Sequence, residues 1–158
     1  MPKSFSKFAS FAFALLVLGL SSAHAETIRS EKGKFSIEIP GQAKFAQISK
    51  RYQWTFEDKR VGWGVSYEDA PGISKRSVKF IYDTLQKALT GDKTSNSRDI
   101  QHRRQQGREI IVDADGGGTM RIWNFVVGDR LYTISYTGPH GTEHSREVDA
   151  VFASFQLD

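Results

Sequence analysis

The chain has 158 residues, with 22 Lys and Arg against 18 Asp and Glu, and it contains no cysteine. The length suits one domain whose hydrophobic core is large enough to be stable without disulfide bonds. Without cysteine the chain has no disulfide framework, no thiolate metal site and no cysteine nucleophile. Residues 1–25 hold the cations Lys3 and Lys7 and no carboxylate, so the remaining 133 residues carry a net charge of only +2.

Residues 1–25 have the three parts of a secretory signal peptide. A short basic stretch at residues 1–7 precedes an apolar run at residues 11–20, and Ala23 and Ala25 occupy the two positions that a signal peptidase reads. The run is shorter than the roughly 20 residues that a membrane-spanning helix needs, and no later segment approaches that length. The sequence therefore predicts cleavage after Ala25 and a mature chain, residues 26–158, that is periplasmic or secreted and has no transmembrane segment.

Three alternating segments predict the strands of a first meander. Residues 35–39, 51–56 and 62–68 each place apolar or aromatic side chains at every second position, which is typical of strands with one face in the core. The aromatic side chains of the second and third segments follow this strand period, so we expect them in the core rather than around a ligand; they are Tyr52, Trp54, Trp63 and Tyr67.

After residue 77 the apolar period changes to that of a helix. One helical stripe contains Val78, Ile81, Tyr82, Leu85 and Leu89. Ser77 or Ser74 can cap the start of the helix because a short hydroxyl side chain satisfies its free amides. Gly91 is a typical C-terminal glycine. The pattern predicts a helix between the two groups of strands.

A second meander follows a polar loop at residues 93–96. Residues 98–104 predict a weak, basic strand, whereas residues 108–113 and 120–127 are apolar on both faces. Residues 130–137 alternate again. We expect a tight hairpin at Gly128 and Asp129 and an end to the last strand at Gly138 and Pro139.

A second helical stripe lies near the C-terminus, at Val148, Val151, Phe152 and Phe155. Strands that are apolar on both faces belong at the centre of a sheet covered on both sides. The sequence therefore predicts an α+β fold in which an antiparallel sheet of six or seven strands is flanked by two helices around one core.

Several of these segments resemble a known family. The sequences GREII at residues 107–111, MRIWNFVVGDRLYTI at residues 120–134 and VFASF at residues 151–155 resemble the C-terminal half of PsbP-like domains, and GKFSIEIP at residues 33–40 is similar to their first strand. The resemblance implies the α/β/α sandwich shared by PsbP, the extrinsic subunit of the oxygen-evolving complex, and a yeast Ran-binding import factor, here in an exported bacterial relative. The matching positions are core and turn positions, so the resemblance implies a fold and no catalytic residue.

His140, Glu143 and His144 spell the H-x-x-E-H pattern of one class of zinc peptidases. That chemistry needs both histidines on one face of a rigid helix, with the glutamate polarising a zinc-bound water. Pro139 and Gly141 flank the first histidine, so we expect the helix to begin near Thr142 and His140 to lie in a loop. We therefore interpret the pattern as a solvated loop, with a zinc-dependent hydrolase as the alternative.

The densest basic segment contains Arg98, His102, Arg103, Arg104 and Arg108. It is either a sheet edge that charges protect from aggregation or a weak docking patch for an anionic surface such as a phospholipid headgroup or an acidic protein. The small net charge of an exported chain argues against nucleic acid as the partner.

No pattern in the sequence assembles a nucleophile with its base, a phosphate-binding loop or a cofactor site. We therefore interpret the protein as an exported, non-catalytic accessory or interaction module of the periplasm or cell envelope, with no cofactor and an unidentified protein or envelope partner. The alternative to this interpretation is a carrier that holds a small apolar ligand between the sheet and a helix.

Overall fold

The computed structural model describes residues 25–91, 95–114 and 116–158. The predicted signal peptide therefore lies outside the described residues, apart from Ala25. The described part contains ten strands, two α-helices and one short 3-10 helix, in the order β1 (Glu26–Ser30), β2 (Phe35–Ile39), β3 (Lys44–Ile48), β4 (Arg51–Asp58), β5 (Val61–Asp69), η1 (Ile73–Lys75), α1 (Val78–Thr90), β6 (Ser95–His102), β7 (Gln105–Ala114), β8 (Gly118–Val127), β9 (Arg130–Pro139), α2 (Arg146–Ser154) and β10 (Gln156–Leu157). None of its helices is long and apolar enough to cross a membrane.

Seven of the strands form one antiparallel sheet with the order β3-β4-β5-β9-β8-β7-β6. The two meanders meet where β5 pairs with β9, with Val65 opposite Ile134. The other three strands form a small sheet with the order β1-β2-β10, which joins the two ends of the described chain.

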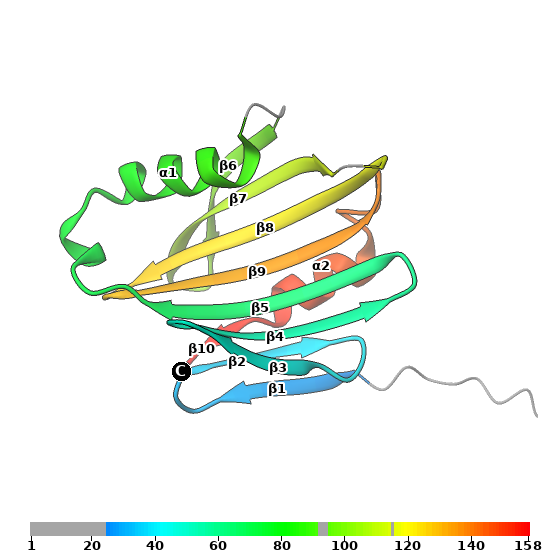
Figure 1. Ribbon diagram of the computed structural model, residues 1–158, viewed down its shortest axis with the longest axis horizontal. Coiled ribbons are helices and arrows are strands. Elements are labelled where there is room, and N and C mark those ends of the chain that lie inside the picture. The colour runs from blue at the N-terminus through cyan, green and yellow to red at the C-terminus, as the bar shows by residue number, and fades with distance from the viewer. Residues whose placement is uncertain (1–24, 92–94, 115) are drawn as a thin grey trace, which may run out of the picture.

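The large sheet is covered on both faces (Figure 1). On one face, the small sheet and α2 enclose the main core, whose fully buried aromatic residues include Phe35, Phe125, Phe152 and Phe155. On the other face, α1 packs over β7 and β8 above a smaller cluster of Ile110, Val112 and Ile122. The interior strands β7 and β8 are therefore apolar on both faces because each face contributes to a different core.

The predicted α+β architecture is confirmed, with a large antiparallel sheet between two helices. The hairpin at Gly128 and Asp129 is present, and Gly91 ends α1 by donating its N–H to the Lys87 carbonyl at 3.0 Å. The four predicted aromatic core residues lie in or against the main core, where Tyr52 and Tyr67 stack with ring centroids 4.8 Å apart.

Several details of the prediction were wrong, including the serine cap of the first helix, because the Ser77 side chain makes no hydrogen bond to the start of α1. The sequence pattern did not predict β1, β3 or β10. Of these, β1 and β10 form the small sheet together with β2. Gly138 and Pro139 do not end the last strand, because β9 continues to Pro139 opposite Gly118 of β8. The second helix begins at Arg146 rather than near Thr142.

Candidate functional site

A buried carboxylate lies at the centre of a polar network on the α2 face of the sheet. The Glu109 side chain is only 2% exposed, and it accepts hydrogen bonds from Arg98 Nε at 2.7 Å, Arg121 Nε at 2.8 Å and Trp123 Nε1 at 2.6 Å. Burial alone would raise the pKa of Glu109, but the hydrogen bonds and the positive charge of Arg121 outweigh it and lower that pKa. A carboxylate held in this way is an acceptor that ties three strands together.

Arg121 extends this network from the sheet to α2. Its Nη1 donates to Asp149 Oδ1 at 2.5 Å and to the Glu143 carbonyl at 2.8 Å. Its guanidinium also lies over the Phe152 ring, 4.5 Å from the centroid. These contacts hold the start of α2 and the preceding loop against β8, so the network fixes the position of α2 on the sheet.

The H-x-x-E-H residues lie in the loop before α2, and neither histidine is on a helix. The His140 Nδ1 atom is 3.7 Å from Asp113 Oδ1, and the His144 Nδ1 atom is 3.8 Å from Asp149 Oδ1, so the two rings face carboxylates on different elements. Glu143 Oε2 is buried without a hydrogen-bond partner in the described residues. Within residues 25–91, 95–114 and 116–158 there is no group of three side chains that could hold a metal ion. The zinc-site geometry is therefore not assembled by these three residues.

The four arginines of the predicted basic patch do not share one surface. Arg98 and Arg108 lie on opposite faces of the β6–β7 hairpin, since Arg98 pairs with Glu109 on the α2 face and Arg108 Nε pairs with Asp99 Oδ1 at 2.7 Å on the α1 face. Arg103 and Arg104 form the turn between the two strands and are exposed. The structure thus brings together only this second pair.

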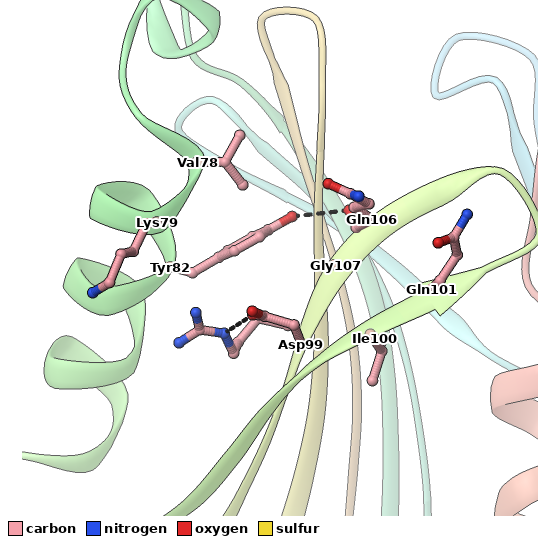
Figure 2. A pocket seen from close by; sticks show the side chains of 9 residues that line it. Val78, Lys79, Tyr82, Asp99, Ile100, Gln101, Gln106 and Gly107 are labelled. Carbon is pink, nitrogen blue, oxygen red and sulfur yellow. Dashed lines mark hydrogen bonds and ion pairs between the residues drawn. The ribbon is translucent and has the colours of Figure 1, made fainter.

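A groove of about 420 Å³ lies between the first turns of α1 and the strands β6 and β7 (Figure 2). Tyr82 anchors the helix beside it, because its hydroxyl donates to the Gln106 carbonyl at 3.1 Å and accepts from the Val126 N–H at 3.3 Å. Burial raises the pKa of the Tyr82 hydroxyl. Besides Tyr82, the groove is lined by Val78, Lys79, Asp99, Ile100, Gln101, Gln106, Gly107 and Arg108.

The helix above this groove exposes more apolar surface than its sequence pattern predicts. Of the five stripe residues, only Ile81 and Tyr82 are buried, whereas Val78 is 48% exposed and Leu89 is 40% exposed. Phe80, which lies outside the stripe, is 53% exposed. We use the name α1 surface for Val78, Phe80 and the groove. Sequence reasoning missed it because the groove exists only where the helix packs across the edge of the distant β6–β7 hairpin.

Comparison with solved structures identifies the architecture. The solution structure of cyanobacterial PsbP (CyanoP) from Synechocystis sp. PCC 6803 superimposes with a TM-score of 0.64 at 12% sequence identity, covering 89% of this chain and 96% of that one. The protein has the PsbP-like fold. The expectation drawn from residues 33–40, 107–111, 120–134 and 151–155 is thus confirmed at the level of fold.

Other comparisons add no further assignment. A protein from Bacteroides thetaiotaomicron matches with a TM-score of 0.47 at 13% identity, over 79% of this chain and 45% of that one. A protein of unknown function from Pseudomonas aeruginosa, described as a putative regulator, matches with a TM-score of 0.44 at 12% identity, over 76% and 86% of the two chains. No family model and no curated protein matches the sequence.

Proposed function

We propose that this PsbP-like protein is an exported accessory module of the periplasm or cell envelope that binds a protein partner and catalyses no reaction. The export part rests on the signal pattern of residues 1–25, with Ala23 and Ala25 before the cleavage point. The binding part rests on one observation, which is that Val78 and Phe80 at the first turn of α1 are exposed to solvent.

The composition of the α1 surface favours a protein over a small apolar ligand. Val78, which lines the groove, and Phe80 on the same turn of α1 are both about half exposed, and large exposed apolar side chains are typical of protein interfaces. The groove itself contains Lys79, Asp99 and Arg108. An apolar ligand would desolvate these charged groups without replacing their hydrogen bonds, whereas the polar groups of a partner protein can pair with them.

The absence of catalysis is supported by what the polar side chains already do. Glu109 has three donors around it, and Arg121 and Arg108 each bind carboxylates of their own chain. These groups stabilise the fold. A reactive carboxylate would instead need a free lone pair facing a cleft.

Photo-cross-linking in intact cells tests the proposal. A photoreactive amino acid replaces Phe80 on the α1 surface, or Phe45 on the edge strand β3 as a matched control, since Phe45 is similarly exposed at 57% but lies at the far edge of the sheet (Figure 1). We expect a discrete protein adduct from position 80 and none from position 45. The same adducts from both positions, or none from position 80 in a folded and exported protein, would contradict the proposal.

A further inference from the structure

A second pocket lies where the β6–β7 turn meets the end of the chain, and we call it the C-terminal pocket. It has a volume of about 330 Å³, and its lining includes His102, Arg103, Arg104, Phe125, Phe155 and Leu157. This volume is at the lower end of the range for small-molecule sites, so the pocket suits a ligand with few heavy atoms.

The floor of the C-terminal pocket is aromatic and rigid. Phe125 and Phe155 are 0% and 1% exposed and stack with centroids 5.7 Å apart at an interplanar angle of 15°. His102 Nε2 lies 2.6 Å from the Phe155 carbonyl oxygen, which fixes the end of β6 against the residue after α2. Because the floor belongs to the main core, it is already formed before any ligand binds.

The rim of the C-terminal pocket contains two arginines whose side chains contact no carboxylate among the described residues. Arg103 and Arg104 are exposed in a tight turn, where Arg103 has a φ of 56°. Among the described residues, neither side chain forms an ion pair or a hydrogen bond, whereas the nearby Arg98 and Arg108 are both paired with carboxylates. Both guanidinium groups therefore keep their donors for a ligand.

The charge of the lining selects the sign of the ligand. No aspartate or glutamate lines the C-terminal pocket. The neighbouring pocket at the β8–β9 turn, which shares Leu157, contains three carboxylates, of Asp69, Asp129 and Asp158, against the two cations Lys34 and Arg130. A broad anionic membrane would meet these carboxylates as well as the arginines, so the arrangement favours a discrete anion over a charged surface.

We propose that the C-terminal pocket binds a small amphiphilic carboxylate. Its apolar part packs against Leu157 over the floor formed by the buried rings of Phe125 and Phe155, and its carboxylate accepts hydrogen bonds from Arg103 and Arg104, a pairing that guanidinium groups favour. This site lies away from the α1 surface, and the proposal does not depend on the protein partner.

Calorimetric titration of the purified protein with phenylbutanoate tests this site, with the matched alcohol phenylbutanol as the uncharged probe. We expect the carboxylate to bind and the alcohol to bind about tenfold more weakly or not at all. In NMR spectra of the wild-type protein, the resonances of Phe125 and Phe155 should shift on titration while those of Lys79 and Phe80 stay in place. Equal affinity for the two probes, no binding of phenylbutanoate, or shifts confined to the α1 surface would each overturn the proposal.

A pair of double variants provides the matched comparison. Arg103→Gln with Arg104→Gln should weaken phenylbutanoate binding about tenfold or more, because both charged donors are lost. Lys59→Gln with Arg60→Gln removes the same charge from the β4–β5 turn, where Lys59 has a similar φ of 51°, and should leave binding unchanged. Equal loss in both variants, or retention of the wild type on anionic phospholipid vesicles without phenylbutanoate binding, would contradict a discrete carboxylate site.

Discussion

At the scale of single residues, Glu109 connects more of the fold than any sequence pattern indicates. Its side chain lies on β7 and accepts from β6 and from two residues of β8, while Arg121 carries the connection on to Asp149 of α2. A buried charge with all its partners in place is stable, but removal of one partner leaves the other uncompensated. Glu109 is therefore a structural residue whose ionised form stabilises the folded state.

The pH dependence of stability tests this role. The folded-state pKa of Glu109 lies below its ordinary value of 4.5, so its stabilising contribution is complete above that value and disappears as the pH falls through the lowered pKa. At pH 7, Glu109→Gln should lower the free energy of unfolding by about 3 kcal/mol. Chemical denaturation of both proteins should show this difference shrinking as the pH falls below 4.5.

The exposed Glu57 on β4 provides the control for this measurement. Glu57→Gln removes the same charge from the surface and should change the free energy of unfolding by less than about 0.5 kcal/mol. A difference between wild type and Glu109→Gln that stays constant from neutral to acid pH would show that the carboxylate charge of Glu109 does not stabilise the fold.

The basic segment shows that the sequence alone could not indicate which arginines share a surface and which pair with carboxylates. The density of arginines predicted one patch, but the β6–β7 register places Arg98 opposite Glu109 and Asp99 opposite Arg108, so these two arginines each pair with a carboxylate. The carboxylates that pair with Arg98 and Arg108 were visible in the sequence. Their pairing depends on the turn at Arg103 and Arg104, and a shift of one residue would send each side chain to the other face.

At the scale of elements, the two helices begin differently although a serine precedes each of them. The Ser145 hydroxyl accepts from the Val148 N–H at 3.3 Å, and Glu147 and Asp149 add negative charge to the first turn of α2. Ser77 makes no side-chain cap, and the first turn of α1 has no acidic residue. The start of α2 is therefore stabilised locally, whereas the start of α1 depends on its packing.

Serine-to-alanine variants measure this difference between the helices. Ser145→Ala should lower the free energy of unfolding by about 1 kcal/mol, because an amide of α2 loses its partner. Ser77→Ala should change it by less than about half that amount, because no cap bond is lost. Equal effects of the two substitutions in thermal or chemical unfolding would contradict this account of the helix starts.

Long elements with a clear period were predictable and short edge elements were not. Strands such as β5 and β8 follow from their alternation or from apolar residues on both faces, which burial in a sheet requires. By contrast, β3 is an edge strand with Phe45 and Ile48 exposed, and its backbone is ordered by pairing with β4. The two-residue β10 exists only through β2. Such strands depend on partners that a local pattern does not contain.

At the scale of the whole molecule, the two faces of the large sheet differ in how fully they are covered. The α2 face holds nearly all of the buried aromatic residues and the Glu109 network, and it joins both meanders and both ends of the described chain. The α1 face has a small cluster of three buried aliphatic residues, and its helix leaves apolar side chains exposed. The α2 face therefore holds most of the core, whereas the α1 face leaves apolar side chains exposed.

This division also explains why the candidate sites were not predictable from sequence. The α1 surface combines residues near position 80 with residues near position 105, and Tyr82 joins them through Gln106. The C-terminal pocket similarly joins the β6–β7 turn to Phe155. Local periods reveal which residues are apolar, but the grooves arise where separate elements pack together.

Native mass spectrometry of the protein recovered from the envelope of its own cells tests whether the chain holds a protein partner at the α1 surface. We predict a complex in which the chain begins at Glu26 and is held with a second protein. Phe80→Ser should deplete this complex, while Phe45→Ser on β3 should leave it intact. A chain recovered alone, or bound equally well by the wild type and by both variants, would contradict a module that works by holding a partner at the α1 surface.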